Sequence, residues 1–378
     1  MKKRVLSLML VLAMAVGMLA GCGGSSDGYE IALITDKGNI DDKSFNQGAW
    51  EGVVEYAEKN NISHKYYKPE EASDAGYYAQ IELAIQGGAK VVVTPGYLFE
   101  VAVYQAQEAF PDVKFILLDG APHTADYATY ETKSNVASVM YAEEESGYLA
   151  GYAAVKDGNR SLGFMGGMAV PAVQAFGYGF LQGVEAAAKE LGLADGEIKM
   201  FYHYTGDFAE TDTNKQTAKG MFASGAEVVF ACGGSVGKSV MSAAAEEGKK
   251  VIGVDVDQRY DSETVITSAM KGLSASVVAV LDSIYKNTFD TYAGKTTYFT
   301  AANNGVGLPT TVIGEENGNA FDRFTSFTKA DYDTVFATIA NGSVDPIRTF
   351  AVADANGYAT ADELVTNLGL TKLSIEVR

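Results

Sequence analysis

Short apolar runs rich in β-branched residues alternate along the chain with longer stretches of helical periodicity. The apolar runs lie at 31–35, 91–94, 115–118, 161–164, 228–231 and 251–254. Each run is apolar on both faces, which is typical of strands covered by helices on both sides of a parallel sheet. The pattern therefore predicts an α/β protein with buried parallel strands.

The stretches between these runs predict helices at 45–60, 76–86, 142–156, 173–191 and 238–247. In the fourth of them, Val173, Phe176, Phe180 and Val184 recur at helical spacing and form one apolar stripe. One strand and helix series lies before about Asn135 and a second after it. Two α/β lobes are therefore expected, and one large doubly wound sheet is the alternative.

The N-terminus has the layout of an export signal. Three basic residues at 2–4 precede an apolar run from Val5 to Ala20, followed by Gly21 and Cys22. The run is shorter than the roughly 20 apolar residues of a membrane span. Small residues before a cysteine resemble the bacterial lipobox, which predicts a signal peptide over 1–21 and acylation of Cys22. A plain secretory signal with an incidental cysteine is the alternative.

Residues 22–28 combine the acylated cysteine with a short Gly/Ser-rich stretch, which predicts a flexible tether. The body of the protein is then expected to be held at the extracytoplasmic face of the cell membrane by its lipid. If Cys22 is acylated, only Cys232 remains, so an intrachain disulfide is not expected.

Charge and composition exclude several classes of partner and site. The net charge is −19 over 378 residues, which disfavours nucleic acid because phosphate binding needs clustered Lys and Arg. His64, His123 and His203 lack the spacing of metal ligands, so neither a metal site nor a cofactor is expected. No H-E-x-x-H motif and no plausible Cys-His arrangement is present, so the protein is not expected to be an enzyme.

Polar residues and glycines follow several predicted strands at the point where each strand ends: Asp36, Asp119, Gly233 with Gly234, and Asp255. Ligands of open α/β sheets bind outside the carboxyl ends of the strands. These positions therefore predict one binding crevice.

Two aromatic residues lie near the predicted crevice. Phe45 and Asn46 follow Asp42 and Ser44, either of which can cap the helix that begins there. Phe208 lies in a polar loop. If the two rings face each other across a cleft, they can sandwich a planar base; packing of Phe45 into the core is the alternative.

Asp255 and Lys271 complete the polar residues of the predicted crevice. A carboxylate accepts hydrogen bonds from vicinal hydroxyls, and a lysine donates them. A salt bridge between the two residues is the alternative. The stretch Cys232-Gly-Gly-Ser-Val-Gly-Lys-Ser239 imitates a phosphate-binding loop, but Cys232 replaces its first glycine, so a glycine turn into a helix is favoured.

Taken together, several motifs resemble those of the basic-membrane-protein (Med/PnrA-like) lipoproteins, which are substrate-binding components of ABC transporters and include purine-nucleoside receptors. The resemblance spans nearly the whole mature chain, although the part beyond Leu308 departs from the family pattern. It rests on Asn39-Ile-Asp-Asp-Lys-Ser-Phe-Asn-Gln47, Gly147-Tyr-Leu-Ala-Gly151, Gly163-Phe-Met-Gly-Gly167 with Pro171, Phe176-Gly-Tyr-Gly-Phe180, Gly253-Val-Asp-Val-Asp-Gln258, Thr267-Ser-Ala-Met-Lys271 and Asn304-Gly-Val-Gly-Leu308.

The resemblance implies a type I periplasmic-binding-protein fold, with two doubly wound α/β lobes, three crossings and a ligand cleft between the lobes. It implies stacking of a purine between Phe45 and Phe208, and recognition of the base edge by Asp36 and Asp119 with Asn46 nearby. The residues implied to hold the ribose are Asp255, Lys271, Gly233 and Gly234.

The implied protein is a monomeric receptor for a purine nucleoside such as guanosine, inosine or adenosine, which it passes to the permease subunits of an ABC importer. We expect one lobe to comprise 29–134 with about 263–322, and the other 135–262 with about 323–378. Alternative functions are a receptor for riboflavin, another sugar-bearing compound or a quorum signal, a surface nucleoside hydrolase, and an adhesin-like structural lipoprotein.

Overall fold

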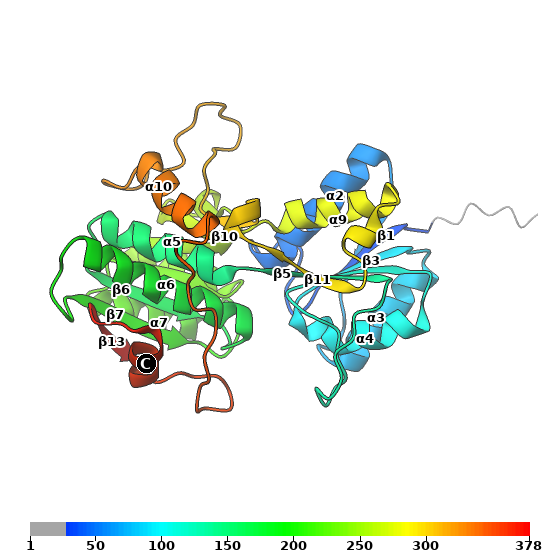
Figure 1. Ribbon diagram of the computed structural model, residues 1–378, viewed down its shortest axis with the longest axis horizontal. Coiled ribbons are helices and arrows are strands. Elements are labelled where there is room, and N and C mark those ends of the chain that lie inside the picture. Colours follow the sequence, from blue (N-terminus) through cyan, green and yellow to red (C-terminus); the bar gives the residue numbers. More distant parts are fainter. Residues whose placement is uncertain (1–27) are drawn as a thin grey trace, which may run out of the picture.

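Two separate β-sheets divide the protein into two lobes (Figure 1). The computed structural model describes residues 28–378, so the predicted signal peptide and Cys22 lie outside the described residues. Within the described part, no helix is both long and apolar enough to cross a membrane. The two lobes and their mainly parallel strands confirm the predicted α/β fold class.

The first lobe is built on six parallel strands in the order β11-β5-β4-β3-β1-β2. Helices α2 and α9 pack together over one face of this sheet, and α3 and α4 cover the other (Figure 1). The strands are β1 (Ile31–Ile34), β2 (His64–Tyr67), β3 (Val91–Pro95), β4 (Lys114–Leu118), β5 (Val136–Tyr141) and β11 (Lys295–Phe299), and the helices are α2 (Phe45–Asn60), α3 (Asp74–Gln86), α4 (Glu100–Ala109) and α9 (Leu273–Tyr285).

The second lobe is built on seven strands in the order β12-β10-β9-β8-β6-β7-β13, and only β12 pairs antiparallel. Its strands are β6 (Ser161–Gly166), β7 (Ile198–Tyr204), β8 (Val228–Cys232), β9 (Lys250–Asp255), β10 (Val265–Lys271), β12 (Val306–Gly307) and β13 (Leu373–Val377). Its helices are α5 (Glu143–Lys156), α6 (Pro171–Glu190), α7 (Asp212–Ala223), α8 (Val236–Glu247), α10 (Lys329–Ala340) and α11 (Ala361–Leu368).

Helices α5 and α6 approach each other closely because glycines line their contact. A Cβ atom added at Gly147 would lie 2.2 Å from the carbonyl oxygen of Phe176, and one at Gly183 would lie 1.9 Å from that of Tyr148. These neighbours are backbone atoms, which cannot move aside as a flexible side chain can. The glycines of the Gly147-Tyr-Leu-Ala-Gly151 motif thus set the packing of the two helices that flank the lobe junction.

The chain crosses between the lobes three times, at 141–143, 271–273 and 299–306. The strand pairings differ from the predicted lobe boundaries: β5 joins the first sheet, whereas β10 and β12 join the second. A run of apolar residues predicts a strand but not the sheet that it joins, because pairing depends on contacts far apart in the sequence. The predicted boundaries at 134 and near 263 are displaced by about one strand, also because β5, β10 and β12 are not among the strands predicted from the sequence.

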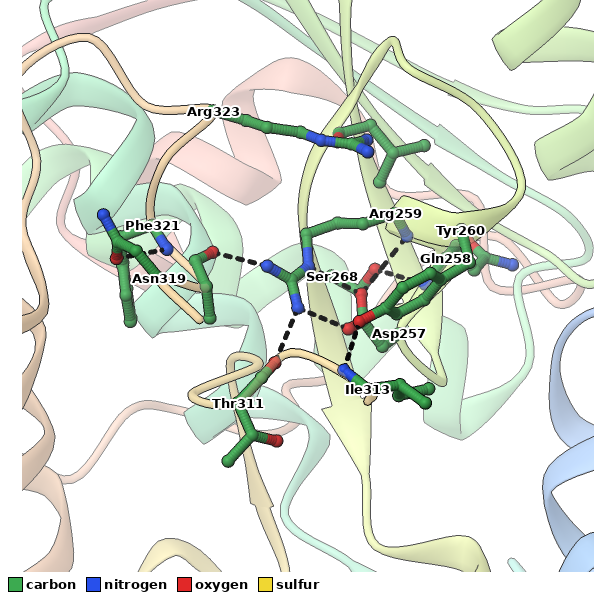
Figure 2. Close-up of polar contacts among 12 residues, drawn as sticks. Asp257, Gln258, Arg259, Tyr260, Ser268, Thr311, Ile313, Asn319, Phe321 and Arg323 are labelled. Atoms are coloured by element: carbon green, nitrogen blue, oxygen red, sulfur yellow. Dashed lines mark hydrogen bonds and ion pairs between the residues drawn. The ribbon is translucent and has the colours of Figure 1, made fainter. Parts of the chain in front are cut away.

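Two arginines tie the segment between β12 and α10 to the second lobe (Figure 2). The Arg259 guanidinium donates to the carbonyl oxygens of Thr311 (2.9 Å) and Ala320 (2.7 Å) and pairs with Asp257 (2.6 Å). Arg323 donates from Nη1 to two backbone carbonyl oxygens beside β10, at 2.9 and 2.8 Å. The segment beyond Leu308 therefore belongs to the second lobe rather than to the first.

Candidate ligand-binding site

A cavity of about 850 Å³ lies between the two lobes and is lined by residues of both. Its volume falls in the range of small-molecule sites. The cavity collects all of the predicted ligand-binding residues except Lys271, namely Asp36, Phe45, Asn46, Asp119, Phe208, Gly233, Gly234 and Asp255. The ends of β1, β4, β8 and β9 thus meet at one place, as the pattern of strand ends predicted.

Asn46 fixes the orientation of Asp36 at the first-lobe wall of the cavity. Its side-chain amide donates to Asp36 Oδ1 (2.8 Å) and to Asp42 Oδ2 (2.8 Å), and its Oδ1 accepts from the backbone N–H of Asp36 (3.1 Å). Gly38 N–H also donates to Asp36 Oδ1 (2.8 Å). Among the described residues Asp36 Oδ2 accepts no hydrogen bond, and burial raises the pKa of this carboxyl. Asp36 can therefore accept a hydrogen bond from a ligand, whereas the amide hydrogens of Asn46 are already used.

Asp42, rather than Ser44, caps helix α2. The Asp42 carboxylate accepts the backbone N–H groups of Ser44 (2.8 Å), Asn46 (3.1 Å) and Gln47 (3.1 Å). Ser44 occupies the N-cap position, but its hydroxyl donates to Asp255 Oδ2 in the other lobe (2.5 Å). The two capping candidates of the sequence thus have separate roles, one within the helix and one between the lobes.

Asp119 and Asp255 both have left-handed backbones, with φ of 54° and 66°. Non-glycine residues rarely adopt this conformation, and such strain is concentrated at functional sites. Each follows or ends a buried strand, β4 and β9 respectively. The sharp change of direction places both carboxylates at the cavity wall.

Lys271 lies behind the cavity wall, where three carboxylates surround it. Its Nζ donates to Asp119 Oδ2 and lies 3.2 Å from Glu143 Oε1 and 3.8 Å from Asp255 Oδ1. Its side chain is 2% exposed. Burial lowers the pKa of Lys271, but the three carboxylates outweigh this and raise it, so the side chain is cationic. The structure therefore shows the alternative, a salt bridge between Asp255 and Lys271, and Lys271 also pairs with Asp119 and Glu143.

Asp119 retains one unsatisfied acceptor. Its Oδ1 is buried and has no hydrogen-bond partner among the described residues. Burial raises the pKa of Asp119 to about 7 despite the opposing effect of Lys271, and the carboxylate of Glu143 adds to the rise. An unpaired buried acceptor costs free energy, so a ligand with an N–H or O–H donor would find a partner here.

Two half-buried phenylalanines enter the cavity from opposite lobes. Phe45 lies in the first turn of α2, with Lys271 Nζ 4.8 Å from its ring centroid. Phe208 lies in the loop before α7, where a Cβ added at Gly167 would come within 2.5 Å of its ring. Gly167 is thus required for the position of Phe208. Aromatic rings in two walls of one cavity suit a flat ligand.

Comparison with known families identifies the chain. Residues 30–339 match the family described as ABC transporter substrate-binding protein, PnrA-like. The chain belongs to this family. The PnrA-like proteins are extracytoplasmic substrate-binding components of ABC transporters, so a ligand and a permease are implied as partners.

Two relatives in the curated proteins illustrate the PnrA-like family. The ABC transporter nucleoside-binding protein BmpA of Lactococcus lactis subsp. cremoris is 30% identical over 340 residues, which cover 82% of this chain and 92% of BmpA. The CD4+ T-cell-stimulating antigen of Listeria monocytogenes is 30% identical over 307 residues, covering 75% of this chain and 82% of the antigen.

Among solved structures, an ABC transporter solute-binding protein of Aeropyrum pernix superposes with a TM-score of 0.72 at 22% identity, covering 87% of this chain and 95% of its own. This likeness confirms the type I periplasmic-binding-protein fold. At this level of identity it carries no information on the ligand.

Several residues that line the cavity of this PnrA-like protein were not predicted from the sequence: Tyr97, Tyr127, Tyr130, Glu143, Phe176 and Arg348. Phe176 belongs to the apolar helical stripe, and such a stripe alone does not indicate a ligand contact. Glu143 follows β5, and the rule of polar residues at strand ends would have found it if that strand had been predicted. Arg348 lies in a segment without periodicity, which gave no signal.

The cavity of this PnrA-like protein offers hydrogen-bonding groups and aromatic rings to a ligand. Cys232 lines the cavity, but burial raises the pKa of its thiol well above the usual value, so it is held protonated. Within residues 28–378, no three His, Cys, Asp or Glu side chains gather as a metal site would require.

Proposed function

We propose that this protein binds a purine nucleoside between its lobes and delivers it to the permease of an ABC importer. The observation that carries the proposal is the pair Phe45 and Phe208, which line one cavity from opposite lobes beside unpaired carboxylate oxygens. The name of the Lactococcus relative, a nucleoside-binding protein, agrees with it.

In this proposal the purine stacks between the two phenylalanine rings. Stacking of a base on an aromatic side chain contributes about 1–3 kcal/mol. Asp119 Oδ1 and Asp36 Oδ2 then accept hydrogen bonds from the N–H groups at the edge of the base. Guanine and hypoxanthine carry such donors, and pairing with them would satisfy the buried oxygen of Asp119.

The ribose lies against Asp255 and the Gly233–Gly234 turn. Gly234 has φ of 53°, and a Cβ at Gly233 would lie 2.7 Å from the backbone nitrogen of Gly167, so both positions favour glycine. Both glycines line the cavity. Asp255 accepts from Ser44 through Oδ2 and can accept from a vicinal hydroxyl through Oδ1. Lys271 acts on the sugar indirectly, by holding the Asp255 and Asp119 carboxylates in place.

A ligand that contacts both walls stabilises the closed arrangement of the lobes, because it binds that arrangement better than an open one. In this proposal the protein is a monomer without enzymatic activity. It is anchored through acylated Cys22 at the extracytoplasmic face of the cell membrane.

The test is a thermal-shift scan of residues 23–378 against purine nucleosides, pyrimidine nucleosides, free bases, riboflavin and sugars, followed by titration calorimetry. A ligand that binds only the native state raises the melting temperature. We expect a rise with purine nucleosides alone. A rise with riboflavin or a sugar alone would reject the nucleoside, and release of hypoxanthine from inosine would show a hydrolase instead.

A further inference from the structure

The segment between α10 and α11 lies outside the part of the chain that matches the family, which ends at residue 339. Over residues 343–360 it contains no helix or strand, and it runs along the second lobe towards β13 (Figure 1). It nevertheless contributes Arg348 to the ligand cavity. A residue outside the family match thus reaches the ligand cavity.

Contacts on both sides of Arg348 hold this segment on helix α6. The side-chain amide of Gln182 pairs with the backbone of Ile347, accepting from its N–H (2.8 Å) and donating to its carbonyl oxygen (2.9 Å). Two residues after Arg348, the ring of Phe350 stacks on Tyr178 with centroids 4.5 Å apart. Arg348 is therefore delivered to the cavity by a fixed backbone rather than by a free loop.

Among the described residues, Arg348 makes hydrogen bonds and ion pairs through one guanidinium nitrogen, Nη1. Arg348 Nη1 donates to the carbonyl oxygen of Tyr141 (2.7 Å) and to Glu144 Oε2 (2.6 Å), and lies 2.6 Å from Glu143 Oε2. The side chain is 25% exposed. A guanidinium has five N–H donors, so those of Nε and Nη2 remain for a ligand.

We propose that Arg348 donates a hydrogen bond from Nε or Nη2 to an oxygen atom of the bound nucleoside and thereby helps to set its specificity. This inference rests on the proposed function. The carboxylates of Glu143 and Glu144 neutralise the positive charge of Arg348. The acceptor is therefore a neutral oxygen, a sugar hydroxyl or a base carbonyl, rather than a phosphate. The excess of carboxylates in the cavity lining also disfavours a phosphate.

A purely structural role makes a different prediction. Tyr141 ends β5 and Glu143 begins α5, so Arg348 also braces the first crossing between the lobes. If bracing were its only role, removal of the guanidinium would weaken binding of every nucleoside by the same factor. A hydrogen bond to the ligand instead singles out one oxygen atom.

The experiment is titration calorimetry of wild type, Arg348→Ala and Arg348→Lys with guanosine, its 2′-, 3′- and 5′-deoxy analogues, 2-aminopurine riboside, which lacks the base carbonyl, and guanosine 5′-monophosphate. We expect Arg348→Ala to bind guanosine about tenfold or more weakly. The loss should vanish for the one analogue that lacks the partner oxygen. Arg348→Lys keeps the charge beside Glu143 and Glu144 but loses the planar fork, so it should fold and show the same selective loss to a smaller extent.

Arg323→Ala is the matched control, because Arg323 also donates from Nη1 to two backbone carbonyls but does not line the cavity. It should lower the melting temperature and leave guanosine affinity unchanged. Equal losses for all analogues, or no loss, would overturn the role of Arg348, and tighter binding of the monophosphate would overturn the neutral acceptor. Failure of the wild type to bind any nucleoside would instead overturn the proposed function itself.

Discussion

The hydroxyl of Ser44 donates a hydrogen bond to Asp255 across the junction between the lobes. A second bond lies beside it, from Gln258 Nε2 to the carbonyl oxygen of Lys43 (2.6 Å). The N-terminus of α2 is therefore attached to the end of β9. Asp255 also lines the cavity, so ligand contact and lobe arrangement are linked at this residue.

Ser44→Ala tests this link. Because Asp42 caps α2, the substitution should change the melting temperature little, while affinity for a purine nucleoside falls several-fold as Asp255 loses a donor. Calorimetry and thermal unfolding measure the two effects. Ser73→Ala is the control: Ser73 caps α3 by accepting from Gly76 N–H, so its loss should cost about 1 kcal/mol of stability without affecting affinity. Unchanged affinity in Ser44→Ala would refute the link.

Phe45→Ala and Phe208→Ala should each remove one stacked face. We expect each to weaken guanosine binding by about 10- to 100-fold, since a stacked aromatic contributes about 1–3 kcal/mol. Both rings are only half-buried, so the folded state should survive. Phe336→Ala is suited as a control, because that half-buried ring packs on Tyr332 away from the cavity. Retention of full affinity by both cavity variants would rule out the sandwich.

Affinity for guanosine should rise with pH across the pKa of Asp119, which burial raises to about 7. The ionised carboxylate accepts a base N–H, and the protonated form does so poorly. Calorimetry between pH 6 and 8 should show this rise in wild type, and Asp119→Asn should bind weakly with no such slope. An identical slope in Asp119→Asn would assign the effect to another group.

The same raised pKa has the opposite effect on the stability of the ligand-free protein. A carboxyl whose pKa is higher in the folded state stabilises the fold below its unfolded value of 3.8, and this contribution is lost as the pH rises through about 7. Between pH 3.8 and about 7, the free energy of unfolding measured with denaturant should therefore fall less with rising pH in Asp119→Asn than in wild type.

Gly147→Ala should destabilise the second lobe. Its Cβ would lie 2.2 Å from a backbone oxygen of α6, so the two helices must separate, at a cost of about 1–3 kcal/mol or more. Gly220→Ala in α7 is the matched control: nothing lies within 4 Å of its Cβ, and removing a helical glycine should stabilise by about 0.5–1 kcal/mol. Denaturant unfolding of both variants measures these values, and equal stability would contradict the tight helix contact.

The strands that the sequence predicted correctly are all buried on both faces. Continuous apolar runs form these strands, which are β1, β3, β4, β6, β8 and β9. Because both faces are buried, nearly every position in such a strand must be apolar. The edge strands were missed for the opposite reason. His64–Tyr67 and Lys295–Phe299 are largely polar and partly exposed, so their pairing depends on neighbours that the local pattern does not reveal.

Some residues of the candidate site could be predicted from the sequence and others could not. Asp36, Asp119 and Asp255 were found because each comes at the end of a buried strand, and the topology of parallel sheets brings such ends together. Arg348 could not be found, because its position depends on the pairing of Gln182 with Ile347, 165 residues apart. Lys271 was expected at the ligand. Its side chain instead lies behind the cavity wall, because it pairs with three carboxylates from separate parts of the chain.

The three crossings also constrain how the protein folds. The first lobe includes β11, which pairs with β5, and α9, which packs on α2, although both follow almost the whole of the second lobe's sheet in the sequence. Until the chain through Phe299 is present, one edge of the first sheet is open and an apolar face of α2 is uncovered. The first lobe is then not an independent folding unit, and a truncation at the first crossing leaves a fragment with an exposed strand edge, a common route to aggregation.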